Sequence, residues 1–323
     1  MTVKLIAYTA GVKKRTPHYP PGRRPGRSLP RRLRRPRVLI LGCGDVGLRL
    51  IRAYAPRLNL IAAARSDAGL QQARQAGAQP LRIDLDDPGS LRRLRGLAAR
   101  VLYSAPPPES GRSDPRARRS VARLAHTQRW VYLSTSGVYG DCAGAWVDET
   151  RPVTPRNDRA IRRVAAERSM RDTHRALILR VPGIYADDRL PLARLRQGTP
   201  ALSPAEDGYT NHIHADDLAR IAFTALWRGR AARVIHAVDQ SELRMGDWFD
   251  AVADRYGLPR PPRLDRATLQ ARVSPMLWSF MSESRRLSSE RLRHELRVRL
   301  RWPTVHDFLA HNPDRSSESA PLG

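Results

Sequence analysis

From Arg37 onward, short apolar runs alternate with stretches in which apolar residues recur at helical spacing. Continuous apolar runs are typical of strands buried on both faces of a parallel sheet, with helices as the connections between them. The pattern predicts six strands, at 38–41, 58–64, 80–83, 101–104, 130–134 and 176–181. It predicts the helices between them near 46–55, 67–76, 88–98, 115–127 and 159–173. This order predicts an α/β fold with a doubly wound parallel sheet, whose ligands bind beyond the carboxyl ends of the strands.

The regular alternation ends at Val181. Prolines and short apolar patches follow, with helices predicted at 215–227, 245–256, 288–296 and 304–309. We therefore expect a first domain over 37–181 and a smaller lobe over 182–310 on its substrate side. Residues 1–36 are basic and proline-rich, residues 311–323 are polar, and neither segment has the pattern of a packed element.

The first predicted strand runs directly into the sequence GCGDVG at 42–47. In this spacing the first glycine permits a tight turn, the second lets the backbone approach a pyrophosphate, and the third lets the helix pack closely on the strand. The first N–H groups of the helix face the phosphates. The same spacing also occurs in ordinary strand–helix turns, so other residues have to support it. The motif predicts a Rossmann-type dinucleotide site formed by Gly42, Gly44, Asp45, Val46 and Gly47.

Arg65 and Ser66 follow the second predicted strand, at the place where an acidic residue indicates NAD. A basic side chain there accepts the 2′-phosphate of NADP. The pair therefore favours NADP as the cofactor, and Asp67 keeps NAD as the alternative. A solvated arginine without a ligand is the other interpretation of Arg65 in a chain this rich in arginine.

Small and acidic residues follow the next two strands. Asp84 is placed to meet the adenine edge, or else to cap a turn together with Asp86 and Asp87. Ala105 and Pro106 begin a small, stiff loop that allows the backbone to lie against a dinucleotide. We expect Asp84, Ala105 and Pro106 to contact the cofactor.

Two further segments carry groups that can bind a ligand. Ser134, Thr135 and Ser136 end the fifth predicted strand, where three hydroxyls can hydrogen-bond a substrate oxygen or the nicotinamide amide. Arg285 or Arg286 could hold an anionic substrate in bidentate fashion. The alternative for the second segment is a capping sequence with solvated arginines.

The charge of the chain is strongly positive, with a formal net charge of +27. Residues 1–37 hold 12 of the 58 Lys and Arg residues and no acidic residue, and the remaining basic residues are spread along the chain. A nucleic-acid surface is clustered rather than spread, so we expect a small-molecule substrate and no nucleic-acid partner. No apolar run approaches the ~18 residues that cross a bilayer, so no membrane partner is expected. The leader is interpreted as a disordered extension or the product of an upstream start codon, with an organellar transit peptide as the weaker alternative.

The cysteines give no indication of a metal site, and His212 and His214, with Asp216 and Asp217 nearby, allow a metal only as the weaker alternative. Cys43 and Cys142 have neither metal-site spacing nor a disulfide framework, which suits a reducing cytoplasm. His212 and His214 alternate along a predicted strand and precede Asp216, which is expected to cap the following helix while His214 orients the turn. We expect no metal.

The chain resembles the extended, NAD-dependent epimerase/dehydratase type of the short-chain dehydrogenase/reductase superfamily. The resemblance covers about 37–309 and is carried by the glycine motif, by Leu133–Asp141, by the sequence RVPGIY at 180–185, and by HIHADDL at 212–218. It implies that Thr135 occupies the place of the catalytic Ser or Thr, and that Val181 and Pro182 line the nicotinamide pocket. These motifs define the superfamily without defining a substrate.

The chain departs from this family at its Tyr-x-x-x-Lys motif. Counting back from Glu167 places Arg163 at the lysine position and Arg159 at the tyrosine position, and no other register supplies the pair. Arginine stays protonated at any working pH, so Arg159 cannot act as an acid and base in the way a tyrosine does. Arg163 can still hydrogen-bond ribose hydroxyls. Other candidate proton donors are Tyr139, Tyr185, His212 and His214.

The leading hypothesis is an NADP- or NAD-dependent oxidoreductase or epimerase-type enzyme acting on a small polar, sugar-like substrate. The alternative is a non-catalytic NAD(P)-binding sensor, because the tyrosine–lysine pair is missing. A homodimer is the candidate assembly.

Overall fold

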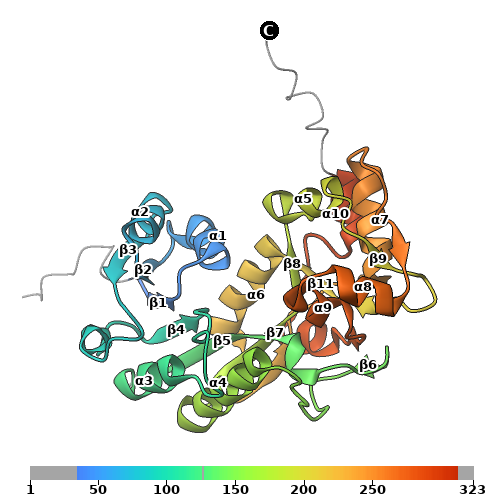
Figure 1. The fold of residues 1–323 in the computed structure, drawn as a ribbon. Coiled ribbons are helices and arrows are strands. Elements are labelled where there is room, and N and C mark those ends of the chain that lie inside the picture. The colour runs from blue at the N-terminus through green and yellow to red at the C-terminus, as the bar shows by residue number, and fades with distance from the viewer. Residues whose placement is uncertain (1–34, 126, 312–323) are drawn as a thin grey trace, which may run out of the picture. The chain divides into compact units, whose positions relative to one another are not determined.

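Seven parallel strands form one sheet, in the order β12-β7-β5-β4-β1-β2-β3 (Figure 1). They are β1 (Arg37–Leu41), β2 (Asn59–Ala64), β3 (Gln79–Arg82), β4 (Arg100–Tyr103), β5 (Arg129–Thr135), β7 (Leu177–Val181) and β12 (Val234–His236). The computed structural model describes residues 35–125 and 127–311, so the predictions on the leader and the polar tail fall almost entirely outside the described residues. Strand order reverses between β1 and β4, which is where ligands bind in sheets of this kind.

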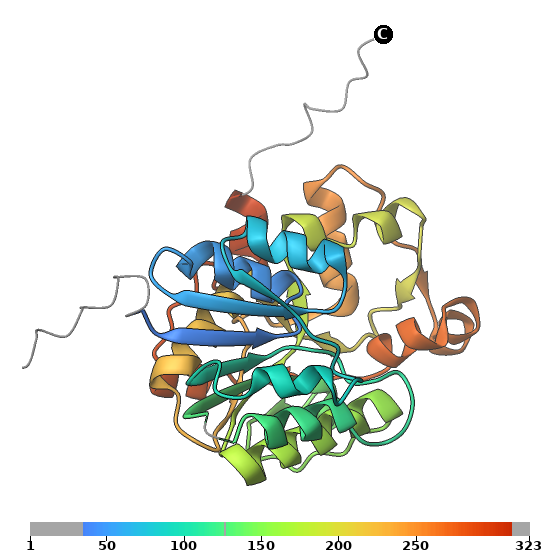
Figure 2. The ribbon, with the colours of Figure 1, turned by 90° about the vertical axis from the view of Figure 1, so that its left-hand side faces the viewer.

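Helices cover both faces of this sheet (Figures 1 and 2). Val38 and Ile40 of β1 pack in one core cluster, which includes residues of α1 (Asp45–Tyr54), α2 (Asp67–Gln75) and α6 (Ala215–Arg228). Leu39 and Leu41 pack in a second cluster, which includes residues of α3 (Pro115–Arg123) and α4 (Asp158–His174). Successive side chains of a strand point to opposite faces, and all four β1 residues are fully buried. The predicted doubly wound α/β fold is confirmed.

The chain after β7 builds a second group of elements beside the sheet (Figure 1). Its helices are α5 (Leu192–Arg196), α7 (Met245–Arg255), α8 (Arg266–Arg272), α9 (Pro275–Met281) and α10 (Val305–His311). Short two-stranded pairs accompany them: β8 (Gly183–Tyr185) with β11 (His212–His214), β9 (Ala201–Leu202) with β14 (Arg263–Leu264), β10 (Tyr209–Thr210) with β13 (Leu243–Arg244), and β6 (Trp146–Val147) with β15 (Arg286–Leu287). Tyr185, Trp248, Phe249 and Phe308 lie in their shared core. The described residues, 35–125 and 127–311, belong to one compact unit.

The structure corrects the predicted elements at several points. The six predicted strands are present, but β12 was missed, because three residues are too few to distinguish a strand from a loop by pattern. The helix predicted at 88–98 is only a 3₁₀ segment at Ser90–Leu94, and the one at 288–296 is a π-helical segment at Leu292–Leu296. The first segment ends early, two residues before Gly96 at positive φ. The second begins four residues late and ends where predicted, before Arg297 at positive φ. Helices α5, α8 and α9 were not predicted, because each is only five to seven residues long. No helix among the described residues is long and apolar enough to cross a membrane.

A buried polar network fixes the second group of elements to the sheet. The Arg180 guanidinium of β7 donates to both carboxylate oxygens of Glu167 on α4, at 3.2 and 2.8 Å, and to the Tyr139 hydroxyl at 2.7 Å. Burial lowers the pKa of His236 to about 3, so its ring is neutral. Its Nδ1–H donates to the Ser288 carbonyl at 3.0 Å, which leaves Nε2 to accept the Tyr139 hydroxyl at 2.6 Å. A series of hydrogen bonds therefore connects α4 with β7, Tyr139, β12 and the carbonyl of Ser288.

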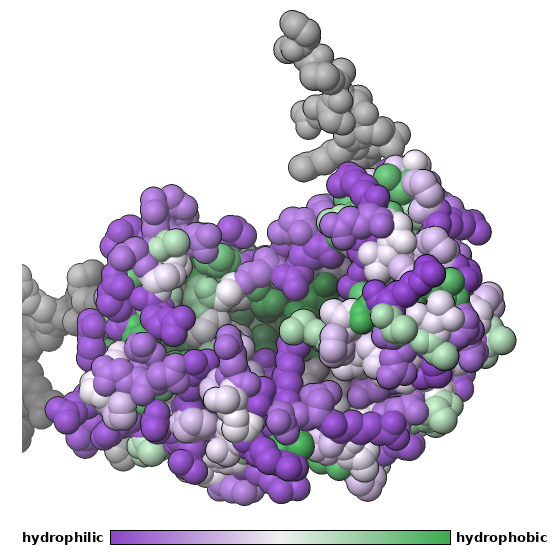
Figure 3. Space-filling model, in the orientation of Figure 1, coloured by the Kyte–Doolittle hydropathy of each residue, from purple (hydrophilic) through white to green (hydrophobic). Residues whose placement is uncertain are grey.

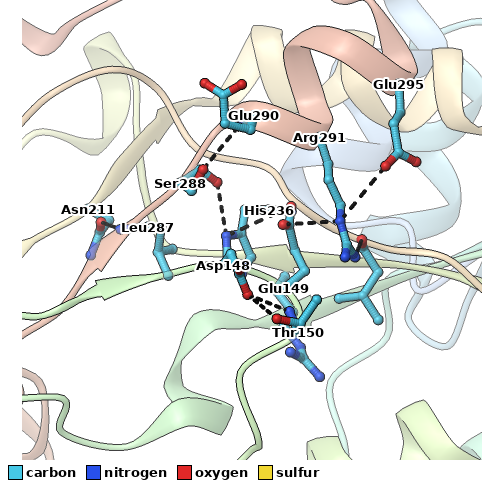
Figure 4. A network of polar contacts seen from close by, with 12 residues as sticks. Asp148, Glu149, Thr150, Asn211, His236, Leu287, Ser288, Glu290, Arg291 and Glu295 are labelled. Atoms are coloured by element: carbon cyan, nitrogen blue, oxygen red, sulfur yellow. Dashed lines mark hydrogen bonds and ion pairs between the residues drawn. The ribbon is translucent and has the colours of Figure 1, made fainter.

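The far side of this network is shown in Figure 4. Glu149 accepts from the backbone N–H of His236 at 3.0 Å and lies 3.5 Å from Arg291, which also contacts Glu295 (Figure 4). Glu149, His236 and the segment that carries Arg291 and Glu295 are distant from one another in the sequence. Charged groups at this depth are tolerated because each one is paired.

We expect Glu167→Gln to lower the free energy of unfolding by about 3–5 kcal/mol, because it leaves the buried charge of Arg180 without its partner. Glu290→Gln breaks an exposed pair with Arg293 and should cost less than about 1 kcal/mol. Urea unfolding followed by circular dichroism measures both. Equal losses for the two variants would contradict the role given to the buried pair.

Candidate functional site

The turn between β1 and α1 has the geometry that the glycine motif predicts. Gly42 has φ +83°, and a Cβ added there would lie 2.4 Å from the Ala105 Cα and N atoms. A Cβ on Gly47 would lie 3.2 Å from Ile40, so α1 packs closely on its own strand. A Cβ on Gly44 would meet no atom within 4 Å. Packing and the positive φ therefore require the first glycine, the third lies in a tight contact, and the second borders open space.

That open space is a small cavity of about 200 Å³, here called the glycine cradle. Its lining includes eight of the predicted cofactor residues: Gly42, Gly44, Asp45, Val46, Gly47, Ser134, Arg163 and Val181. The Ser134 hydroxyl is buried and has no hydrogen-bond partner among the described residues. Because it borders the cradle, this hydroxyl is available to hydrogen-bond a ligand there. The residues of the cradle fit a dinucleotide.

Asp45 places a carboxylate at the edge of the cradle, where it would repel a phosphate if it were unpaired. It is paired on both sides, by Arg49 Nε at 2.8 Å and by Arg189 Nη1 at 3.2 Å. Arg189 borders both the cradle and the larger cavity described below. Nothing in the sequence distinguished Arg189 from the many other arginines, and only its position in space identifies it.

The predicted adenosine-side residues lie outside the cradle, at the ends of β2 and β3. Arg65 is exposed, and its carbonyl accepts from Arg82, whose carbonyl in turn accepts from Arg93 at 3.2 Å. These three arginines gather at the surface beside Asp67, which pairs with Arg82. The Ser66 hydroxyl accepts from the Gly69 N–H at 3.2 Å and so caps α2.

Asp84, Ala105 and Pro106 also lie beyond the lining of the cradle. Asp84 accepts from the Asp86 N–H at 2.9 Å, so it caps a turn, which was the structural alternative for this residue. Ala105 is buried against Gly42 and holds the glycine turn in place from the side of β4. The Pro106 carbonyl accepts from Arg116 at 3.3 Å.

A second cavity of about 900 Å³, here called the large cavity, opens beside the cradle and shares Ile184 and Arg189 with it. Figure 3 shows a hollow with an apolar floor and a polar rim at the centre of this face. Thr135 and Pro182, both predicted to lie at the reaction centre, line this cavity. The Thr135 Oγ1 accepts from the Gly137 N–H at 3.2 Å, which leaves its own hydroxyl hydrogen free to donate to a ligand.

The two arginines at the tyrosine and lysine positions line different cavities. Arg163 borders the cradle, and its Nη1 donates to the Tyr132 hydroxyl at 3.0 Å and the Leu133 carbonyl at 2.9 Å. Arg159 borders the large cavity, with its guanidinium 5.9 Å from the centre of the Phe280 ring. The register counted from Glu167 thus places one cation at each cavity.

None of the candidate proton donors matches a tyrosine activated by a cation. Tyr139 lines neither cavity, and burial raises its pKa to about 12. Tyr185 lines the large cavity, but burial raises the pKa of its hydroxyl further still. Burial lowers the pKa of His212, which also lines the large cavity, to about 3, so this ring is neutral and cannot supply a proton.

His214 corrects one detail of the predicted turn. Its Nδ1 accepts from the Asp216 N–H at 3.2 Å, so His214 itself is the N-cap of α6 and Asp216 lies in the first turn. Between residues 35 and 311, apart from residue 126, no group of three His, Cys, Asp or Glu residues is placed to hold a metal.

The arginine pair at 285–286 divides between two roles. Arg285 lines the large cavity and is paired with Glu283 at 2.8 Å and with the Gly140 carbonyl at 2.6 Å. Arg286 instead donates to the Gly144 carbonyl at 2.9 Å and packs over the rings of Trp146 and Tyr209. Only the first of them can contact a ligand in the large cavity.

No family model matches this chain, and no curated protein matches it. Among solved structures, a conserved protein of unknown function from Silicibacter pomeroyi DSS is 32% identical, with a TM-score of 0.74, over 85% of this chain and 97% of that one. A protein from Methylobacillus flagellatus, provisionally assigned as an NAD-dependent epimerase/dehydratase, is 28% identical, with a TM-score of 0.64, over 83% of this chain and 94% of that one. The dTDP-glucose 4,6-dehydratase DesIV of Streptomyces venezuelae, solved with NAD bound, shares the fold at 20% identity, with a TM-score of 0.68, over 85% and 94% of the two chains.

We expect Gly44→Val to leave the free energy of unfolding within about 0.5 kcal/mol of the parent, because its side chain enters open space at an ordinary backbone angle. The same side chain should weaken NADPH and NADH binding by about tenfold or more, because it fills the cradle. Gly42→Ala is the contrasting variant and should cost about 3 kcal/mol through its clash with Ala105. Fluorescence titration and thermal unfolding separate the two effects, and unchanged binding by Gly44→Val would rule out the cradle as the dinucleotide site.

Proposed function

Because this chain is an extended short-chain dehydrogenase/reductase-like protein of the epimerase/dehydratase type, we propose that it is an NAD(P)-dependent oxidoreductase or epimerase-type enzyme with a small polar substrate. The observation that carries the proposal is the adjacency of the two cavities. The cradle joins the large cavity at Ile184 and Arg189, so a dinucleotide in the first can present its reactive end to a substrate in the second.

The backbone of the turn between β1 and α1 would hold the dinucleotide in the cradle. The N–H groups at the start of α1 would hold the diphosphate, and the Ser134 hydroxyl, which has no partner among the described residues, would hydrogen-bond the bound dinucleotide. Arg163 bridges Tyr132 and Leu133, which holds its guanidinium at the cradle for a ribose hydroxyl. When bound, the nicotinamide supplies hydride chemistry, and the protein supplies binding and orientation.

We assign NADP rather than NAD as the preferred cofactor. The support is the group formed by Arg65, Arg82 and Arg93 at the ends of β2 and β3, where the 2′-phosphate lies in dinucleotide-binding sheets. Asp67, the acidic side chain that would favour a free 2′-hydroxyl, is paired with Arg82 at the surface.

On the substrate side, Thr135 holds the oxygen whose charge changes. Its hydroxyl hydrogen is free because its lone pair receives the Gly137 N–H. The arginine at position 159 can stabilise negative charge on that oxygen but cannot deliver a proton. The final proton therefore comes from a group other than the tyrosine that the family uses, with solvent in the open cavity as the candidate source.

A non-catalytic dinucleotide sensor is the second candidate function. The observation that favours it is the replacement of both members of the Tyr-x-x-x-Lys pair by Arg159 and Arg163. A sensor would bind the dinucleotide and convert no substrate.

We expect Arg65→Gln to weaken NADPH binding by about tenfold while NADH binding changes by less than roughly twofold, because only NADPH carries the 2′-phosphate. Arg74→Gln, at the opposite end of α2, is the matched control and should change neither affinity. Both are measured by fluorescence titration at fixed ionic strength. An equal loss for NADH and NADPH would contradict the NADP assignment.

Turnover distinguishes the enzyme from the sensor. Parent protein incubated with NADPH or NADP and a panel of carbonyl compounds, alcohols and nucleotide sugars should change the absorbance at the nicotinamide band. Thr135→Ala should reduce kcat/KM by about 100-fold and Thr135→Ser by much less, because serine keeps the donor. Dinucleotide binding without turnover across the panel would favour the sensor.

A further inference from the structure

The walls of the large cavity carry a strong excess of positive charge. Four arginines line it, at positions 159, 189, 194 and 285, against a single acidic residue, Glu283. Two of the four are neutralised in place, Arg285 by Glu283 and Arg189 by Asp45. Arg159 and Arg194 have no carboxylate within ion-pair distance in the part of the chain that the structure describes. Two uncompensated cations therefore face the space that the substrate enters.

Arg159 is held in an unfavourable electrostatic position. It lies in the first turn of the 17-residue helix α4, at the positive end of the helix dipole. Arg162 and Arg163 follow it by three and four residues, so all three lie on the same side of the helix. Arg162 donates to the Gly111 carbonyl, and Arg163 donates to Tyr132 and Leu133, so neither has a carboxylate partner. Burial and these two neighbours lower the pKa of Arg159. Asp114, the acidic group that faces this cluster, interacts with Arg163 only at long range and is buried.

Three arginines that are less exposed than Arg159 have carboxylate partners. Arg180 has Glu167, Arg233 has Glu295, and Arg263 has Asp250. Arg100, Arg162 and Arg286 have no carboxylate, but each donates to a backbone carbonyl. Arg159 and Arg194 have neither a carboxylate nor a carbonyl acceptor among the described residues, so their N–H groups are available to a ligand that enters the cavity.

We propose, resting on the proposed function, that the substrate carries a carboxylate or phosphate group, and that this oxyanion binds to Arg159 beside Thr135 in the large cavity. A guanidinium offers two parallel N–H donors, which match the two oxygens of such a group. Arg194 on α5 adds a second positive charge to the large cavity. Its guanidinium lies 5.3 Å from the centre of the Phe249 ring. The arginine at the tyrosine position thus selects and orients the substrate.

The rest of the cavity wall indicates the remainder of the substrate. Met276 and Phe280 of α9 line the cavity, and both are more than half exposed. Trp248 and Phe249 of α7 also line it. A compact anionic head with an apolar or ring-shaped body fits this combination of two free cations and an apolar wall.

The test uses protein saturated with NADPH, so that the cradle is filled and phosphate cannot bind there. Titration calorimetry measures the affinity for inorganic phosphate and for malonate, with glycerol and malonamide as neutral probes. We expect both anions to bind and the neutral probes not to bind. Tighter binding of phosphate indicates a phosphate-bearing substrate, and tighter binding of malonate indicates a carboxylate.

Arg159→Gln should weaken anion binding by about tenfold or more, and Arg159→Lys should weaken it less, because lysine keeps the charge without the paired donors. Arg194→Gln should have an intermediate effect. Arg168→Gln, exposed on the same helix and outside the cavity, is the matched control and should change nothing. Circular dichroism verifies folding, and Arg159 has no ion pair whose loss would destabilise the protein.

Equal anion affinity in the parent and in Arg159→Gln would overturn the proposal, as would equal binding of malonate and malonamide. NADPH affinity is measured for every variant and should be unchanged by Arg159→Gln. If the parent fails to bind NADPH, the proposed function fails, and the same anion titrations on the unloaded protein with Arg159→Gln still decide the present proposal.

Discussion

The close approach of the Gly42 backbone to Ala105 is the constraint on which the rest of the site depends. The end of β1 and the end of β4 meet there with no room for a single additional carbon atom. Because these neighbouring strands carry connections that run to opposite sides of the sheet, their ends separate just beyond this contact and leave the cradle between them. The positive φ of Gly42 turns the chain so that the first N–H groups of α1 face that space. One backbone contact thus sets the place, the depth and the polarity of the dinucleotide site.

The large cavity is positioned by a different device, the buried network around Arg180. This arginine belongs to β7 in the sheet, and its partners lead through Tyr139 and His236 to the segment that follows β15. The same β7 continues through Pro182 into β8, whose residues line the large cavity. Fixing β7 against α4 therefore fixes Arg159, on the first turn of α4, relative to Pro182 and Tyr185. The neutral state of His236 is a consequence of this burial, and it allows the ring to accept one hydrogen bond and donate another.

The replacement of tyrosine and lysine by two arginines changes what the site can do without changing its layout. A lysine and an arginine both offer a cation to a ribose, so Arg163 keeps a binding role at the cradle. A tyrosine and an arginine differ more, because a neighbouring cation can lower the pKa of a phenol enough for it to exchange a proton, whereas a guanidinium stays protonated. The guanidinium offers charge and paired donors instead. In a cavity with a second free cation, that exchange favours recognition of an anion over acid–base catalysis.

The sequence by itself determined the doubly wound fold, the limits of six of its seven sheet strands to within about two residues, and the identity of the glycine turn. It did so because buried parallel strands are continuous apolar runs and because each motif glycine answers a local backbone requirement. It also located Arg159 and Arg163, since a fixed count along one helix needs no tertiary information. The tertiary structure alone decided which arginines matter. Arg189 and Arg194 look like any others in the chain, and Arg285 and Arg286 are adjacent and chemically identical. Only the folded chain shows which carboxylates reach them, because ion pairs form between residues brought together from distant segments.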